Sequence, residues 1–191
     1  MLSITPTAQS RRALIVLSAS SLAWIAATIE LATPGFLWSV DPDGMMHALL
    51  QANTMSMPVL GLDGYAPSSP VTTAVIAIDC LMGLMSATAL FYAGCLFRHL
   101  LPSHDWTEQN AKRLWRVGLL CLCIPLANTI AGFLQSLALG LDLPAGQAGV
   151  NLGIDLSSPA FNQVVMGLLL CAFSLILRDM KHLREENAAY I

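Results

Sequence analysis

The sequence predicts an all-α integral membrane protein, an antiparallel four-helix bundle with both termini in the cytoplasm. Three observations predict this class. Of the 191 residues, 55% are apolar and only 11% are charged, and the mean hydropathy is +0.65. A soluble domain carries charge on about a quarter of its residues, so much of this surface faces lipid rather than water. The second and third observations are four long segments nearly free of charge and an uneven placement of basic residues.

The four apolar segments are the predicted spans of a single membrane domain, because a bilayer core of about 30 Å needs roughly 20 residues of helix. Their only charged residues are Glu30 and Asp79. A cleaved signal peptide is the alternative for the first segment, which follows Arg11 and Arg12, but its apolar run is longer than such peptides usually carry. The predicted spans cover about 13–31, 71–97, 117–141 and 156–177 of residues 1–191.

Basic residues predict the orientation, since Lys and Arg beside a span stay on the cytoplasmic side. The outer connections, 32–70 and 142–155, contain Asp residues but no Lys or Arg. All basic residues lie before the first span, in the inner connection 98–116 or in the tail 178–191. The nine are Arg11, Arg12, Arg98, Lys112, Arg113, Arg116, Arg178, Lys181 and Arg184.

Helix signals extend into the connections. Asp105 to Glu108 reads as a capping box, so a helix is expected to start there and to enter the third span, with a kink at Pro125. Asp41 to Gly44 predicts a turn, and Met45 to Asn53 predicts a short interfacial helix. After the fourth span, residues 178–187 can prolong its helix into the cytoplasm.

Polar residues within spans are the first candidate site, because an unpaired charge in hydrocarbon costs a few kcal/mol or more. Asp79 lies within the second span, and no Lys or Arg is expected at its depth. We expect it to be protonated or hydrogen-bonded to amides, either as a structural contact or as part of a proton or cation relay. Its candidate partners are Glu30, Asn128, Gln135, Asn162 and Gln163.

A basic surface and a methionine cluster are two further candidates. The basic surface is interpreted as an anchor to anionic lipid heads or as a docking surface for a cytosolic partner. Thioethers and an imidazole suit Cu(I), although apolar packing is the favoured interpretation of the methionines and copper binding is the alternative. The docking residues would be Lys112, Arg113, Arg116, Arg178, Lys181, Arg184, Glu185, Glu186 and Asn187. The copper ligands would be Met45, Met46, His47, Met55 and Met57.

Several classes of function are disfavoured by the sequence. A net charge of −3 argues against direct nucleic-acid binding. None of the four histidines lies within a predicted span, where a transmembrane haem needs its axial ligands. No nucleophile elbow, P-loop, dinucleotide fingerprint or metalloprotease motif is present, so we expect no enzyme activity and no cofactor. Gly132, Ser136 and Gly140 form a small-residue stripe that predicts close helix packing.

Two segments carry a resemblance to a known family. Asn110 to Gly118 and the tail from Leu183 to Asn187 resemble an uncharacterised family, a domain of unknown function, of small four-helix bacterial inner-membrane proteins. The similarity covers residues 90–191, and the tail departs from the family by ending Ala188 to Ile191 without the usual Thr. Many members are encoded beside a Cro-repressor-like helix-turn-helix regulator. The resemblance therefore implies the bacterial inner membrane and a cytosolic helix-turn-helix partner, but no activity.

Three functional hypotheses follow. The leading one is a non-enzymatic regulatory protein that binds a cytosolic helix-turn-helix regulator through its inner connection and tail. The alternative is a small transporter or copper-handling protein that uses Asp79 and the outer Met/His residues, and four spans would then form a pore only as a homo-oligomer. The third is a membrane-organising or accessory subunit.

Overall fold

A computed structural model describes residues 6–54, 65–99, 108–143 and 158–189. This part of the chain is all helical. It forms α1 (Pro6–Val40), α2 (Pro42–Asn53), α3 (Ser69–His99), α4 (Glu108–Gly140) and α5 (Ser158–Ala189). Every helix except α2 is long and apolar enough to cross a membrane, which gives four candidate spans and a multi-pass membrane protein.

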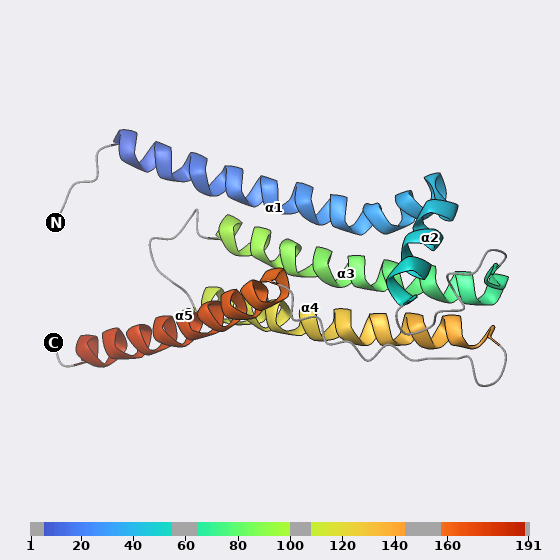
Figure 1. Ribbon diagram of the computed structural model, residues 1–191. Coiled ribbons are helices and arrows are strands. Elements are labelled where there is room, and N and C mark those ends of the chain that lie inside the picture. Colours follow the sequence, from blue (N-terminus) through green and yellow to red (C-terminus); the bar gives the residue numbers. More distant parts are fainter. Residues whose placement is uncertain (1–5, 55–64, 100–107, 144–157, 190–191) are drawn as a thin grey trace.

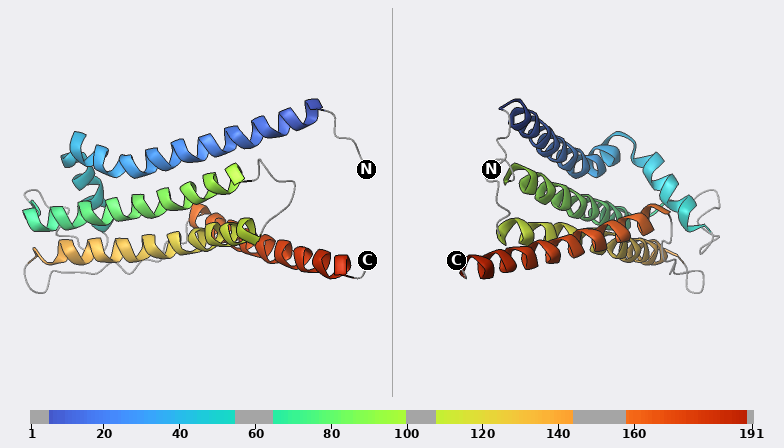
Figure 2. Two further views of the ribbon diagram at one scale, coloured as in Figure 1. Left: turned by 180° about the vertical axis from the view of Figure 1, so that it is seen from behind. Right: turned by 90° about the vertical axis from the view of Figure 1, so that its left-hand side faces the viewer.

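The long helices follow one another in an open row (Figures 1 and 2). α3 packs between α1 and α4, and α5 packs against α4, while neighbouring helices run in opposite directions. The start of α1, the end of α3, the start of α4 and the end of α5 consequently lie at the same end of the molecule. Closure of the row into a bundle and the cytoplasmic placement of the termini stay predictions.

α1 is longer than the first predicted span. It passes through Pro34 and ends at Val40, so the span boundary placed at residue 31 was too early. Residues 31–40 are apolar apart from Thr33 and Ser39, whose hydroxyls bond to carbonyls of their own helix. The helix therefore continues into what the sequence suggested was an outer loop.

α2 confirms the short helix predicted between the first two spans. It begins at Pro42 rather than at Met45, because the Asp41 side chain caps it by accepting a 2.9 Å hydrogen bond from the Gly44 amide. Its apolar side packs across the ends of α3 and α4, where a cluster joins the two helices. The cluster consists of Val71, Leu139 and Leu143, with Met46, Leu49, Leu50, Tyr65 and Ala138 packed against it.

The last two helices confirm the predicted continuations. α4 begins at Glu108 and continues into the apolar segment, while the expected cap at Asp105 lies outside the described residues. It runs as a single helix through Pro125. α5 continues past its apolar segment to Ala189 without interruption. The tail is therefore a helical extension of the last span.

Side chains are distributed as a membrane protein requires. Large apolar side chains cover the outside, among them Leu22, Phe36 and Phe161, which are each more than 60% exposed. The contacts between helices instead use small residues: Gly83 lies against Pro34 and the Glu30 carbonyl, and Gly94 lies against Trp24. Small residues let backbones approach closely where no hydrophobic effect drives association.

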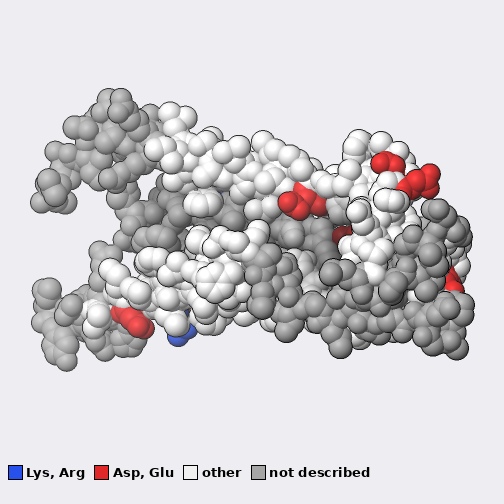
Figure 3. Space-filling model, viewed as in Figure 1, with Lys and Arg blue, Asp and Glu red and all other residues white. Residues whose placement is uncertain are grey.

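Charges separate along the helix axes. Arg98, Lys112, Arg113, Arg116 and Arg178 mark one end, which we call the basic end. Asp41, Asp43 and Asp142 mark the opposite end, which we call the acidic end. In Figure 3 most of the visible acidic side chains lie over the α2 half of the molecule, and one lies at the opposite end, close to the visible basic side chain. Glu108 and Asp179 also lie at the basic end, so it is the basic residues that are segregated: the described residues of the acidic end include no Lys or Arg.

Candidate functional site

Asp79 is the centre of a polar network that joins three helices. The Trp38 indole Nε1 of α1 donates a 2.7 Å hydrogen bond to Asp79 Oδ2 on α3. The Gln135 Nε2 of α4 donates a 2.6 Å hydrogen bond to Asp79 Oδ1. Both carboxyl oxygens therefore have a donor, which offsets the removal of this half-buried side chain from water. Among the described residues, Asp79 has no Lys or Arg partner.

A groove of about 290 Å³ opens beside this network, between α1 and α3. Asp79 and Glu30 both line it, so two carboxyl groups from different helices face one space. Glu30 is exposed, whereas Asp79 is held by its two donors. The complete lining is Glu30, Thr33, Pro34, Leu37, Met45, Asp79, Met82, Gly83 and Ser86. Carboxylates, hydroxyls and thioethers are all groups that attract cations.

The structure gathers only part of the predicted intramembrane set. Gln135 bonds to Asp79 and Glu30 shares its groove. Asn128 and Asn162 instead lie on exposed faces of α4 and α5 and donate no hydrogen bond to Asp79. The polar site therefore belongs to α1, α3 and the acidic half of α4.

Trp38 is the network residue that sequence reasoning missed. Its position in the assumed outer loop hid it, yet only 6% of its surface is exposed. The available signal was a tryptophan followed by polar residues at the end of an apolar run. A buried indole N–H needs a hydrogen-bond acceptor, and for Trp38 this acceptor is Asp79 Oδ2.

The proposed copper ligands have different surroundings. Met45 lines the groove, Met46 packs against the apolar cluster, and His47 is exposed. Met55 and Met57 lie outside the described residues. Within the described ranges, no group of three or more His, Cys, Asp or Glu side chains is placed to hold a metal. Of the three members that the structure describes, Met45 alone shares a groove with the two carboxyl groups.

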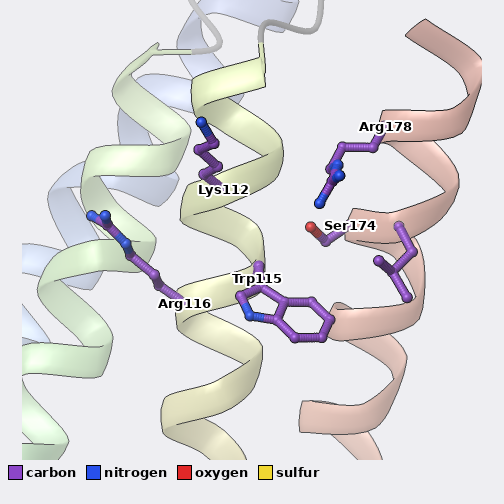
Figure 4. A pocket seen from close by; sticks show the side chains of 6 residues that line it. Lys112, Trp115, Arg116, Ser174 and Arg178 are labelled. Carbon is purple, nitrogen blue, oxygen red and sulfur yellow. The ribbon is translucent and has the colours of Figure 1, made fainter. Parts of the chain in front are cut away.

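A second pocket lies at the basic end, between α4 and α5 (Figure 4). It has a volume of about 180 Å³ and is lined by Lys112, Trp115, Arg116, Ser174, Leu175 and Arg178. Lys112 also forms a 2.7 Å ion pair with Glu108, one helical turn earlier. Three basic residues therefore line this pocket, where α4 begins and where the apolar part of α5 ends. In Figure 4 the Arg178 side chain points toward α4, whereas the Arg116 side chain extends from α4 toward α3, away from α5.

The other predicted docking residues are not among those that line this pocket. Arg113 is half-buried, and its buried Nη1 atom has no hydrogen-bond partner. The remaining members belong to the last turns of α5, and their side chains lie outside the described part. These members are Lys181, Arg184, Glu185, Glu186 and Asn187.

At the acidic end, a hydrogen-bonded junction joins α4 to the segment before α3. The Tyr65 hydroxyl donates a 3.2 Å hydrogen bond to the Leu139 carbonyl. Asp142 accepts a 2.6 Å bond from the Ser68 amide and a 2.9 Å bond from the Ser68 hydroxyl. Burial, assisted by the negative charge of Asp142, raises the pKa of Tyr65 above its ordinary value. The protonated phenol is therefore the form that this junction stabilises.

Comparisons with protein families, with curated proteins and with solved structures found no match to this chain.

Proposed function

We propose that this chain is a non-enzymatic multi-pass protein of the bacterial inner membrane that holds a cytosolic helix-turn-helix regulator at its basic end. A signal in the bilayer or at the acidic end would alter that hold. The observation that carries the proposal is the continuity of α5, which runs as one helix from Ser158 to Ala189. The class of partner is taken from the family resemblance of the tail.

α5 is suited to pass a movement to its tail because it is held tightly against α4. Gly167 lies against the Gly118 carbonyl oxygen, and the Ser174 hydroxyl donates a 2.7 Å hydrogen bond to the Ala111 carbonyl. Beyond these contacts α5 continues past the start of α4 (Figure 1). A tilt of α5 within the bilayer would therefore displace the tail without bending the helix.

The tail and the start of α4 together offer a mixed-charge surface to a partner. Lys112, Arg113 and Arg116 belong to the first turns of α4, and Arg178 begins the polar part of α5. The tail then alternates basic and acidic residues up to Asn187. Complementary charges of this kind favour specificity and association rate more than raw affinity.

The decisive experiment is a cross-linked pull-down from native membranes. The intact chain is compared with one truncated after Met180, which keeps the whole candidate span Ser158–Met180. We expect a helix-turn-helix protein to be captured only by the intact chain, and its target transcription to change on truncation. Gln51→Ala on α2, at the acidic end, is the matched control and should capture the same protein as wild type. Equal capture by the truncated chain would reject the proposal.

A second candidate function, cation or proton movement, is favoured by the groove that Glu30 and Asp79 share. A homo-oligomer would be needed, because the open row of helices encloses no pore among the described residues. This function predicts that Asp79→Asn and Glu30→Gln each reduce ion flux in cells. If copper is the cargo, Met45→Leu should lower copper tolerance as well. Wild-type flux and tolerance in all three variants would remove this candidate.

A further inference from the structure

We propose that α5 pairs with the α5 helix of a second copy of this chain, as a parallel two-stranded coiled coil. The evidence is a stripe of large apolar side chains, which we call the α5 seam, that the described part of the chain leaves exposed. Its six members are each 49–59% exposed: Met166, Leu169, Phe173, Ile176, Met180 and Leu183. The inference does not rest on the regulator proposed above, because it concerns only contacts between copies of this chain.

The α5 seam has the spacing of a coiled coil. Its residues follow one another at alternating intervals of three and four, along a helix that is continuous from Ser158 to Ala189. These intervals define the a and d positions of a heptad repeat. Within the polar residues 178–187, Met180 and Leu183 are the only large apolar residues, and both lie on the seam. The apolar stripe therefore continues where α5 has left its charge-free segment.

The α5 seam faces away from α4. Gly167 and Ser174, which contact α4, occupy b positions on the opposite side of the helix. Cys171, at an f position, lies against Gly118 of α4. Arg178, also at an f position, points toward α4 in Figure 4. Because α5 is the last helix of the open row, a second copy can contact the seam without displacing α4.

The two middle helices define the level at which the apolar core ends on the basic side. Gln135 of α4 donates a hydrogen bond to Asp79 of α3, so these two residues lie at one level. Arg98 follows Asp79 by 19 residues, and Arg116 precedes Gln135 by 19 residues. Since α3 and α4 are antiparallel, both arginines lie at the same level, directly outside the apolar segments of their helices.

Most of the α5 seam lies beyond this level. Gly167 of α5 lies against Gly118 of α4. Two residues further along α5, Leu169 is therefore level with Arg116. Leu183 is 14 residues further still, about 21 Å along the helix. Lipid tails give apolar side chains no reason to associate, but outside the apolar core the hydrophobic effect favours burying them against one another.

The charges beside the α5 seam are complementary between two copies. Copies inserted in one membrane share an orientation, so their α5 helices run parallel about a twofold axis. In a parallel pair, a g residue of one helix meets the following e residue of the other. Asp179 is at a g position and Arg184 is at the following e position, so opposite charges meet twice in the dimer. Asn187 is at an a position, where Asn specifies register and the number of strands.

Oxidative cross-linking in native membranes tests the α5 seam. Single cysteines are introduced into a chain whose native cysteines have been changed to Ala or Ser, and copper phenanthroline is the oxidant. Ile176→Cys and Leu183→Cys should give disulfide-linked homodimers, because equivalent d positions face each other in a parallel pair. Arg178→Cys, at an f position, is the matched control and should remain monomeric. Equal cross-linking at all three positions, or at none, would overturn the proposal.

Charge reversal tests the pairing of Asp179 with Arg184 of the second copy. Association of the purified full-length chain is measured in detergent micelles by sedimentation equilibrium, without any cytosolic protein. Asp179→Arg places like charges opposite each other and should weaken the dimer about tenfold. Adding Arg184→Asp to that variant should restore the wild-type affinity. Glu185→Arg, at an f position, is the matched control and should leave the affinity unchanged.

Three results would overturn the proposed dimer. They are a monomeric wild type, an equal loss of affinity in Asp179→Arg and Glu185→Arg, and no recovery in the double variant. A failed dimer is distinguishable from a failed regulator, because the pull-down identifies a captured protein whereas these measurements use the purified chain. Unfolding temperatures of all variants establish that each is folded.

Discussion

Gly118 on α4 and Gly167 on α5 lie so close together that a Cβ atom on Gly167 would be 2.8 Å from the Gly118 carbonyl oxygen. A Cβ atom on Gly118 would meet the Cys171 amide nitrogen at 2.9 Å. Both obstacles are backbone atoms, which cannot move without separating the helices. The small-residue contact that fixes α5 is therefore this pair, whereas Gly132 in the predicted stripe has nothing within 4 Å of its Cβ position.

Gly167→Leu should weaken the contact between α4 and α5. Forcing a large side chain into a filled space costs about 1 to 3 kcal/mol of stability. Reversible unfolding in mixed micelles provides the measurement. Gly132→Leu on α4 is the control and should unfold within about 0.5 kcal/mol of wild type, as surface substitutions usually do. Equal destabilisation by both substitutions would contradict the assigned contact.

The two donors to Asp79 should each contribute measurably to stability. Hydrogen bonds between membrane helices are worth about 0.6 kcal/mol on average and up to about 1.7 kcal/mol. We expect Trp38→Phe and Gln135→Leu to lower the unfolding free energy by amounts in this range. Both effects should shrink when Asp79 is first replaced by Leu, because the shared acceptor is then missing.

A double-mutant cycle measures this coupling, and Asn128→Leu supplies its control. Asn128 is an exposed amide on the same helix as Gln135 and donates no hydrogen bond to Asp79. Its substitution should show no coupling to Asp79→Leu. Fully additive effects for Trp38 and Gln135 would mean that the network does not hold the three helices together.

The spans could be predicted from the sequence because each apolar segment is long and because charge interrupts it so rarely. The first boundary was wrong, since the span was ended at residue 31, directly after Glu30, whereas the helix continues through Pro34 to Val40. A proline within an apolar helix is tolerated when packing against a neighbouring helix compensates for the hydrogen bond that it removes. A carboxylate is tolerated when it faces a groove rather than lipid. In α1 these conditions are met by the packing of Pro34 against Gly83 and by the groove that Glu30 lines.

The candidate sites could be predicted only in part. Asp79 could be identified because it is the only charged residue in the predicted span 71–97, and amide partners were expected for it. Which amide reaches it depends on the register between α3 and α4, and that register is set by contacts such as Val71 with Leu139. The basic pocket depends on the register of α4 and α5, which the Gly118–Gly167 contact sets. No pattern within a single segment contains this information.

The junction at Tyr65 should make stability depend on pH in the alkaline range. A group whose pKa is raised in the folded state stabilises the fold fully below its unfolded pKa, here about 10. That contribution is lost as the pH rises through the higher folded value. We therefore expect the unfolding free energy of the wild type to fall above about pH 10.

Tyr65→Phe isolates this effect, because it removes the titrating hydroxyl together with the bond to the Leu139 carbonyl. It should be less stable at neutral pH and should show a shallower decline above about pH 10. Asp142→Asn should lower the pKa of Tyr65, as followed by tyrosinate absorbance against a Tyr92→Phe reference. The same alkaline slope in wild type and Tyr65→Phe would refute the role of this tyrosine.

The basic end should lie on the cytoplasmic side, because Lys and Arg beside membrane spans are retained there. Gln51 on α2 and Gln109 on α4 are exposed and mark the acidic and basic ends. Each is replaced by Cys in a chain whose native cysteines have been changed to Ala or Ser. A membrane-impermeant maleimide is then applied to intact spheroplasts and to permeabilised ones.

We expect Gln51→Cys to react in intact spheroplasts and Gln109→Cys to react only after permeabilisation. The native cysteines are Cys80, Cys95, Cys121, Cys123 and Cys171, and all five lie within the long helices. Reaction of both introduced cysteines from outside would mean that α3, the long helix between them, does not cross the bilayer. The reverse pattern would place the basic end outside the cytoplasm, where a cytosolic regulator could not reach it.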